Sequence, residues 1–262
     1  MATIDEYSLA AIPIELIFNS TNLGVGTAFV WAQDNQHFLI TNWHNVSGKD
    51  PNTGKHVLKS AAEPNKIQAW FNHKGQLGNK IAKSIAIRDA NDAPLWFVHP
   101  AHGNKVDVVA LPLETYPDVE MYAINTLSND NLLVQIGMDV FVIGFPFGIG
   151  PGGLPIWKRG SIASEPELSP APFLNLFIDT ASRPGMSGSP VVRRSWGTHM
   201  MAGNNIAVGT NTATKFLGVY SGRIASQDPL DAQLQRRRFT QSTAAASIST
   251  CRRPVSTRRS PR

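Results

Sequence analysis

The pattern that most restricts the fold of this chain is a succession of short apolar runs separated by turns rich in Gly, Asn and Pro. The runs alternate apolar and polar residues or are rich in Val, Ile, Phe and Trp, which is typical of β-strands. No stretch before the C-terminal region keeps a helical period. Expected strands lie at 12–18, 24–31, 38–41, 67–71, 81–87, 95–99, 139–143, 157–163, 174–178, 191–192 and 216–220. Many short strands at this spacing predict an all-β chain, folded as a barrel or a sandwich.

A serine between glycines is the strongest candidate functional feature. Ser187 stands in Gly185-Met186-Ser187-Gly188-Ser189-Pro190. Glycines adopt φ values that other residues resist, and they keep bulk away from the serine oxygen. An exposed hydroxyl beside free backbone N–H groups is what acyl transfer needs. The alternative is an ordinary surface turn, since Gly, Ser and Pro are common turn residues.

A histidine and a carboxylate precede this serine in suitable settings. His44 ends the β-rich run Phe38 to Val46, and Asp107 starts the apolar run Val106 to Leu113. The order His, Asp, Ser is one of the known arrangements of a catalytic triad. Three other aspartates lie in the same part of the chain, but none starts an apolar strand: Asp89, Asp92 and Asp118.

With these residues in place, the sequence resembles the trypsin-like, chymotrypsin-fold serine peptidases, in their bacterial HtrA-like and glutamyl-endopeptidase branch. Thr41-Asn42-Trp43-His44 is similar to the histidine motif of the family, Asp107-Val108-Val109-Ala110-Leu111 to its aspartate motif, and 185–190 to its serine motif. The run 142–150, followed by 160–164, resembles the Gly-x-Pro-Phe-Gly hairpin of HtrA-like domains. The resemblance covers roughly residues 10 to 230.

The resemblance implies an all-β fold of two packed six-stranded antiparallel β-barrels. The peptidase domain would span 1–235, with a first barrel at about 10–115, a linker at about 116–131 and a second barrel at about 132–230. The range 236–262 lacks apolar periodicity and is rich in Arg and Ser, so we expect a disordered tail. We expect no PDZ domain after the barrels, because the range that follows them is too short for one.

The implied reaction is peptide-bond hydrolysis through a covalent acyl-enzyme. His44 would act as general base, Asp107 would orient it and Ser187 would attack. The backbone of Gly185, Met186 and Ser187 would form the oxyanion hole, with the N–H groups of Gly185 and Ser187 as donors. No cofactor and no metal are required. The alternative is a catalytically idle trypsin-like fold that acts as a protein-binding or chaperone-like module.

Substrate contacts are expected at four further residues by the same resemblance: Ala181, Tyr220, Ser221 and Gly222. Ser221 would bond the triad aspartate, and the substrate would pair with this strand as an added strand. Ala181 stands where trypsins carry an acidic residue, so no preference for Arg or Lys is expected. We expect a small to medium apolar residue before the cleaved bond. Met186 stands where digestive trypsins carry the aspartate used in activation, so that kind of activation is not expected.

Composition narrows the choice of partners and compartment. Eight arginines follow Gln235 and no acidic residue does, so the formal net charge of +5 becomes −3 for residues 1–235. The high pI therefore reflects the tail, and we expect a polypeptide substrate with no nucleic-acid partner, although an Arg-rich tail that binds nucleic acid is a rival reading. Cys251 is the only cysteine, which excludes an intrachain disulfide. With an acidic N-terminus and no long apolar run, we expect no signal peptide, no membrane contact and a cytoplasmic location; the oligomeric state is open.

Two further patterns have simpler interpretations. His99 and His102 could form half of a metal site, but no Cys or HExxH partner accompanies them, and two loop histidines are the simpler account. The glycines between 148 and 153 could suggest a phosphate loop, yet no Gly-Lys-Ser/Thr follows, and a β-hairpin explains them better.

Overall fold

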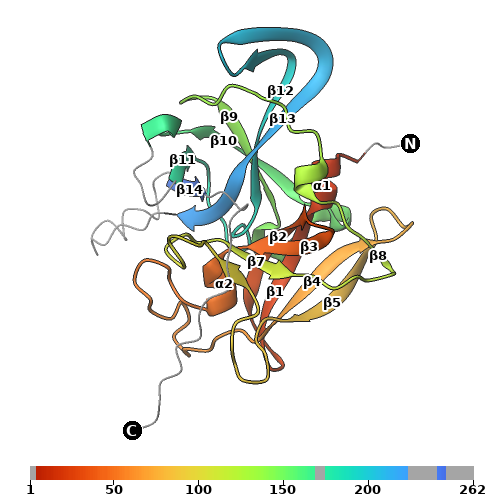
Figure 1. Ribbon diagram of the computed structural model, residues 1–262, viewed down its shortest axis with the longest axis vertical. Coiled ribbons are helices and arrows are strands. Elements are labelled where there is room, and N and C mark those ends of the chain that lie inside the picture. The colour runs from red at the N-terminus through yellow and green to blue at the C-terminus, as the bar shows by residue number, and fades with distance from the viewer. Residues whose placement is uncertain (1–3, 169–174, 224–240, 246–262) are drawn as a thin grey trace.

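The computed structural model describes residues 4–168, 175–223 and 241–245 of the chain. Two curled antiparallel sheets make up the described part, one below the other in Figure 1. The prediction of an all-β, two-barrel fold is confirmed. What matters for function is how the loops at the ends of these sheets are brought together.

The first sheet has eight strands in the order β5-β4-β1-β2-β3-β7-β6, with β8 paired to β4. Two of them, β6 and β8, have only two residues each, which accounts for the excess over the six expected. The strands are β1 Ala11–Phe18, β2 Thr21–Gln33, β3 Gln36–Thr41, β4 Lys66–His73, β5 Lys80–Ala86, β6 Phe97–Val98, β7 Val109–Pro112 and β8 Val119–Glu120.

The second sheet is a closed six-stranded barrel in the order β10-β11-β14-β13-β12-β9. Its strands are β9 Asp139–Gly144, β10 Ile156–Ile162, β11 Asn175–Asp179, β12 Pro190–Met201, β13 Asn205–Arg223 and β14 Gln241–Ala245. The hairpin expected from 142–150 and 160–164 is the β9–β10 pair. In Figure 1, β12 and β13 extend beyond the barrel as a long hairpin at the top.

β14 lies inside the range predicted as a tail. Its five residues pair with β11 and β13 and close the barrel. Sequence analysis did not separate this strand from the tail because no apolar alternation marks it. The other residues of the predicted tail, 236–240 and 246–262, lie outside the described residues, so the prediction of disorder stays a prediction.

Helices are short throughout the described residues. They are α1 Glu6–Ala10, α2 Trp43–Ser47 and the 3-10 turns η1 Ile124–Thr126, η2 Pro146–Gly148, η3 Pro151–Gly153 and η4 Pro166–Leu168. Among these residues no helix has the length and apolar character needed to cross a bilayer. Asp5 caps α1 by accepting a hydrogen bond from the Tyr7 N–H, and its carboxylate also pairs with Arg194 of β12. This pair ties the N-terminal helix to the second barrel.

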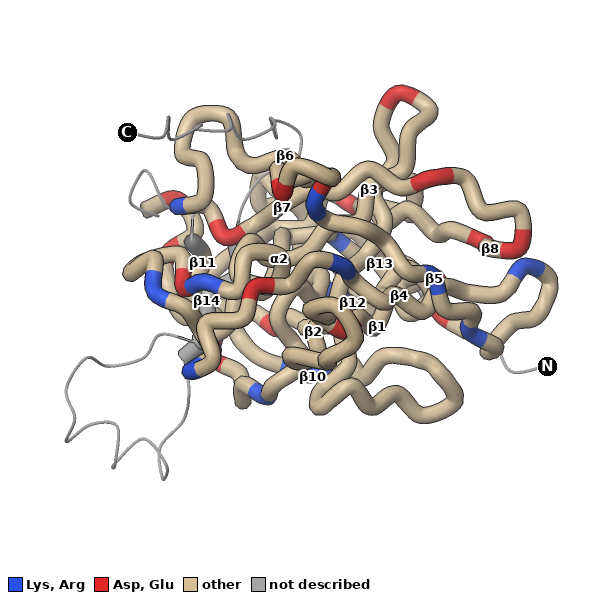
Figure 2. Tube along the Cα trace, turned by 90° about the horizontal axis from the view of Figure 1, so that it is seen from below, with Lys and Arg blue, Asp and Glu red and all other residues tan. Residues whose placement is uncertain are grey.

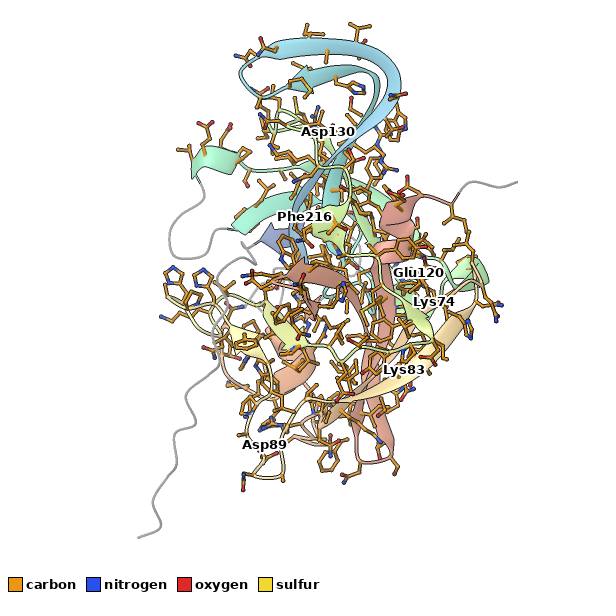
Figure 3. The ribbon with its side chains drawn as sticks, turned by 45° about the vertical axis from the view of Figure 1, so that its right-hand side comes forward. Lys74, Lys83, Asp89, Glu120, Asp130 and Phe216 are labelled. Carbon is orange, nitrogen blue, oxygen red and sulfur yellow. The ribbon has the colours of Figure 1, made fainter. Side chains whose placement is uncertain are left out.

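Apolar side chains hold the two sheets against each other. One buried cluster joins Phe29 and Ile40 of the first sheet to Ile143, Val192 and Val219 of the second. The aromatic ring of Phe216, labelled in Figure 3, packs edge-on against Phe29 at 5.6 Å between ring centroids. Because strands from both sheets contribute to one core, the loops at their ends are held in a fixed relation.

The segment 116–131, predicted as the linker, runs from the first sheet to the second and contains β8 and η1. Near its end the Asp130 carboxylate accepts a hydrogen bond from the Thr214 N–H at 2.7 Å, and Asp130 is labelled beside the second barrel in Figure 3.

Acidic and basic residues are interspersed along the tube in the view of Figure 2. The boundaries of the domains remain a prediction.

Candidate active site

His44 follows the end of β3 closely, as the sequence suggested, and lies on the short helix α2. β3 stops at Thr41, Asn42 is the N-cap, and α2 then presents His44 in its first turn. The Asn42 side chain donates to the backbone carbonyl of Asp107 at 2.7 Å instead of capping α2. This bond fixes the histidine segment against the segment that carries the aspartate.

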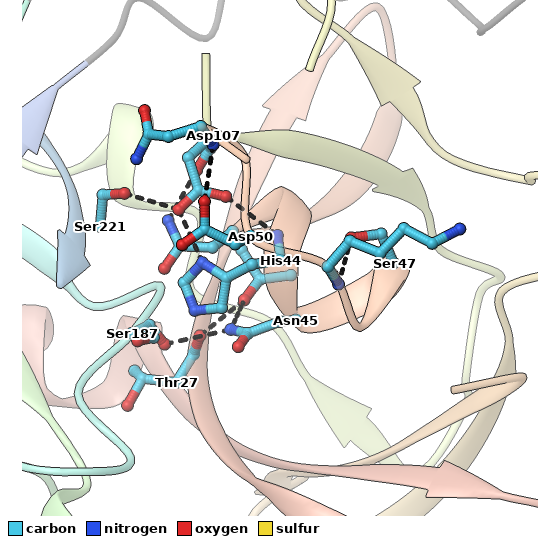
Figure 4. Close-up of polar contacts among 12 residues, drawn as sticks. Thr27, His44, Asn45, Ser47, Asp50, Asp107, Ser187 and Ser221 are labelled. Carbon is cyan, nitrogen blue, oxygen red and sulfur yellow. Dashed lines mark hydrogen bonds and ion pairs between the residues drawn. The ribbon is translucent and has the colours of Figure 1, made fainter. Parts of the chain in front are cut away.

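Asp107 lies two residues before β7 and is 8% exposed. Its Oδ1 accepts a hydrogen bond from the His44 backbone N–H at 2.9 Å, and its Oδ2 lies 2.6 Å from His44 Nδ1. The Ser221 hydroxyl donates to the same Oδ2 at 2.5 Å. The carboxylate is therefore held from three sides, with the imidazole between it and Ser187 (Figure 4).

The other aspartates weighed from sequence make different contacts. Asp89 accepts hydrogen bonds within its own turn from the N–H groups of Asn91 and Ala93. Asp118 pairs with Lys83 at 2.7 Å. Of the four aspartates considered, Asp107 is the one whose carboxylate contacts His44.

Ser187 stands in the turn before β12, between two glycines that have positive φ. Gly185 has φ +90° and Gly188 has φ +87°, a region where side chains are strained. A Cβ on Gly185 would lie 2.3 Å from the Phe145 carbonyl oxygen, and one on Gly188 would lie 2.0 Å from that of Thr27. Both glycines are required by conformation and by space.

A buried network of hydrogen bonds joins the serine turn to the histidine helix. The Ser187 carbonyl accepts from the Thr27 N–H at 2.8 Å and from the Asn45 side-chain amide at 3.3 Å. Asn45 also donates to Thr41 Oγ1, and Thr41 donates to the Thr27 carbonyl. The Thr27 hydroxyl donates to the Gly185 carbonyl at 2.7 Å. Since Asn45 follows His44 directly, this network fixes the base relative to the serine.

The backbone N–H groups of the serine turn differ in their engagement. Met186 donates its N–H to the Arg183 carbonyl at 3.3 Å and buries its side chain in the second barrel. The N–H groups of Gly185 and Ser187 have no hydrogen-bond partner among the described residues. Two unengaged donors on either side of Met186 suit an oxyanion, and Met186 itself contributes packing.

The four expected substrate residues lie at two places. Tyr220 is bound through its backbone, with its N–H donating to Ser189 and its carbonyl accepting from Gly188, while its ring is buried in the barrel. Ser221 and Gly222 follow on β13, and a Cβ on Gly222 would meet no atom within 4 Å. Ala181 is exposed, and its carbonyl accepts a hydrogen bond from Lys158 Nζ.

Opposing effects act on the pKa of His44, and together they raise it above 6.5. Burial alone would lower it, but the charge of Asp107 and its hydrogen bond to the ring favour the protonated form, and Asp50 adds to this. Asp50 is labelled beside the imidazole in Figure 4. The arrangement stabilises an imidazolium, which is what a base that accepts a proton during reaction requires.

Comparison with protein families now assigns the chain. A family model for the trypsin-like peptidase domain matches residues 26–198, more than half of the sequence. The chain belongs to this family. Trypsin-like peptidases act on polypeptides, so membership supports a protease function and a polypeptide substrate.

Solved structures with this trypsin-like peptidase fold are distant in sequence. The serine endoprotease from Yersinia pestis is 12% identical with a TM-score of 0.50, covering 94% of this chain and 63% of that one. The active form of the Rv3671c protease from M. tuberculosis is 17% identical with a TM-score of 0.45, covering 92% and 77%. The MamO protease domain from Magnetospirillum magneticum is 14% identical with a TM-score of 0.46, covering 92% and 93%. No curated protein matches the sequence significantly.

Several residues of this trypsin-like peptidase site were not found from sequence. Asn45 and Thr41 are polar residues within an apolar run next to His44, and that position was the available signal. Lys158 is a basic residue inside an expected strand.

The rings of His99 and His102 stack at 4.9 Å between centroids, and within the described residues no group of three or more His, Cys, Asp or Glu is arranged to hold a metal.

Proposed function

We propose that this protein is a serine endopeptidase that cleaves peptide bonds through His44, Asp107 and Ser187. One observation carries the proposal: Asp107 accepts hydrogen bonds from both the ring and the backbone N–H of His44, while Asn45, the next residue of that helix, donates its side-chain amide to the Ser187 carbonyl. Direct hydrogen bonds thus join the acid to the base, and Asn45 ties the segment of the base to the backbone of the serine turn.

Ser187 would attack the carbonyl carbon of the substrate as His44 takes the proton from its hydroxyl. The Nδ1–Asp107 bond holds the tautomer in which Nε2 accepts that proton. His44 would then pass the proton to the departing amine, leaving an ester between Ser187 and the acyl part of the substrate. Water, activated by the same imidazole, would hydrolyse that ester and restore the enzyme.

The N–H groups of Gly185 and Ser187 would stabilise the negative oxygen that forms in each tetrahedral intermediate. Such a donor contributes about 2.7 to 4 kcal/mol to the transition state when it is held in place. Here the Thr27 hydroxyl holds the Gly185 carbonyl, and the Phe147 N–H donates to the Pro184 carbonyl at 2.7 Å. These bonds set the orientation of the peptide units in the turn before the oxygen arrives.

The substrate backbone would bind along β13. On the side of β12, strand pairing of β13 ends near Tyr220, which is hydrogen-bonded to Gly188 and Ser189. Ser221 and Gly222 continue beyond that point, and no described strand pairs with them on this side. An extended peptide could therefore add there as a strand, directly beside the serine turn.

Labelling with a fluorophosphonate probe tests the proposal, because such a probe reacts covalently with an activated serine. We expect the full-length protein to be labelled and Ser187→Ala not to be. Ser189→Ala is a matched control: Ser189 is two residues away in the same turn, and its buried hydroxyl has no hydrogen-bond partner among the described residues. Labelling should persist in this control.

The same experiment separates the rival function. A folded wild-type protein that resists the probe but binds unfolded polypeptide would support an idle, protein-binding module and contradict a peptidase. Hydrolysis of a fluorescent casein, lost in Ser187→Ala and kept in Ser189→Ala, would support the peptidase.

A further inference from the structure

Lys158 begins on the inner side of the second barrel, where an apolar residue is the usual occupant. On β9, Val142 stands opposite Lys158 of β10 and opposite Val191 of β12. Directly opposed residues of antiparallel strands point to the same face. Val142 and Val191 belong to the buried core of this barrel, so the Lys158 side chain starts on that face too.

From there the side chain reaches the loop that carries the nucleophile. We use the name serine loop for residues 181–187. The Lys158 ammonium donates a hydrogen bond to the Ala181 carbonyl, at the first residue of this loop. Ala181, Arg183 and Pro184 are exposed, whereas Met186 points into the barrel core beside Val142. The serine loop thus has an ammonium at its first residue and Ser187 at its last.

No ion pair neutralises the charge of this ammonium within the part of the chain that the structure describes. Within the described residues no carboxylate lies within ion-pair distance of Lys158. Its neighbour Arg159, by contrast, makes two hydrogen bonds to the Asp139 carboxylate. Burial, and the nearby charge of Arg183, lower the pKa of Lys158, as expected for a cation without a counter-ion.

The Lys158 ammonium, held against the serine loop without a described counter-ion, favours some substrate side chains over others. When a substrate carbonyl sits against the N–H groups of Gly185 and Ser187, the residue that supplies it must rest its side chain on the serine loop or on β13 at 220–222. In this location a substrate carboxylate would be attracted by the positive charges of both Lys158 and Arg183. An Arg or Lys there would face two like charges.

We propose that Lys158 makes this peptidase prefer an acidic residue, Asp or Glu, immediately before the bond it cleaves. Lys158 is the specificity residue, and Arg183 adds to the same field from the surface of the loop. This inference rests on the proposed function, and it replaces the apolar preference expected from Ala181 alone. The sequence pattern drew attention to Ala181, but the charge beside it comes from another strand.

The test compares matched fluorogenic peptides that differ only before the cleaved bond, Glu against Gln and Asp against Asn. We expect the wild-type kcat/KM to favour each acid over its amide by about tenfold to 100-fold. Lys158→Met should bring the ratio near one, Lys158→Glu should invert it, and Lys158→Arg should retain it. Arg183→Gln should reduce the ratio by a smaller factor. Arg159→Gln, a paired cation on the same strand, is the matched control and should leave the ratio unchanged.

Because each ratio is taken within one variant, a loss of folded protein cancels from it. A wild-type ratio near one, or a ratio that Lys158→Met leaves unchanged, would overturn the inference. Fluorophosphonate labelling of every variant distinguishes the two failures. Labelling that persists without an acid preference contradicts the role of Lys158 alone, whereas a wild-type protein that is never labelled contradicts the peptidase itself.

Discussion

The interiors of the two sheets differ in the size of their apolar cores and in the contacts that nearby cations make. The main core of the first sheet is apolar, formed by buried residues such as Leu39, Ile67 and Phe71. The second barrel has a smaller apolar core, and its cations Lys158 and Arg193 donate to the backbone carbonyls of Ala181 and Met200, whereas Lys80 of the first sheet donates to the Asn72 side chain.

This difference separates two tasks. The first sheet supports the loops that carry His44 and Asp107, whose relative position the proposed mechanism requires to be fixed. The second barrel contributes the serine and, on our proposal, the charge that selects the substrate. Lys158 is only partly buried and its hydrogen bond to Ala181 is exposed, so its charge can serve recognition at a smaller desolvation cost than a fully buried charge would carry.

The largest expected effect tests the support side of this comparison. Asp107→Asn should lower kcat by about 10⁴-fold, because the amide favours the wrong tautomer of His44 while leaving the packing intact. The measurement is peptide hydrolysis by protein shown to be folded by circular dichroism. Asp118→Asn, which removes a carboxylate paired with Lys83, should leave kcat near the wild-type value. A loss in Asp107→Asn below about tenfold would contradict the assigned role.

The next effect compares the two interiors in stability. Ile67→Ala empties a fully buried site in the first core and should lower the free energy of unfolding by about 2–5 kcal/mol. Lys158→Met keeps the volume of the side chain but removes an unneutralised charge, so its change should stay within about 1 kcal/mol of zero or stabilise. Urea denaturation followed by tryptophan fluorescence measures both. Equal destabilisation by the two variants would break the comparison between the interiors.

A third effect tests the shape of the serine turn. Gly185→Ala strains a backbone at φ +90° and places a Cβ against the Phe145 carbonyl, so it should displace the oxyanion donors. We expect kcat to fall by about 10²–10³-fold. Gly203→Ala is the matched control, because Gly203 also has a positive φ, of +80°, but lies in the turn between β12 and β13. Similar losses of activity in both variants would show that general strain, rather than the donors, is responsible.

The smallest effect concerns pH. His44 must be neutral to accept a proton, so kcat/KM should fall as pH drops below its pKa, and the midpoint should lie above 6.5 because that pKa is raised. Asp50→Asn removes one of the charges that raise the pKa and should move the midpoint to lower pH. Asp92→Asn, at an exposed carboxylate near Arg88, should not move it. A midpoint that shifts upward in Asp50→Asn would contradict the electrostatic account.

Sequence analysis was most successful where chemistry is written in short local motifs. The β-rich runs predicted the fold class, and Gly185 and Gly188 have the positive φ that the serine motif suggested. The contact between Ser221 and Asp107 also appears as the family resemblance implied. For the fold class and the serine turn, a few adjacent residues carry the information, because turn geometry depends mostly on local backbone preferences. The Ser221–Asp107 contact joins residues 114 positions apart and was predicted only through the family resemblance.

Contacts between segments far apart in the chain were harder to predict from the sequence. β14 has no apolar alternation and becomes a strand only because β11 and β13 lie ready to pair with it. Met186 was predicted as part of the oxyanion-hole backbone; its N–H donates to the Arg183 carbonyl, and its side chain packs in the core of the second barrel. Asn45 looks like any polar residue after a histidine until the Ser187 carbonyl is placed beside it.

The amino-acid sequence by itself predicted the strand-rich architecture, the turn at the serine and the candidate residues His44, Asp107 and Ser187, because each prediction depends on residues that are neighbours in the chain. Only the tertiary structure decided that Asn45 joins two loops and that Lys158 reaches Ala181 with no carboxylate of the described residues paired with it. These features arise from strand register and from the closing of a barrel, which bring together residues from segments far apart in the sequence.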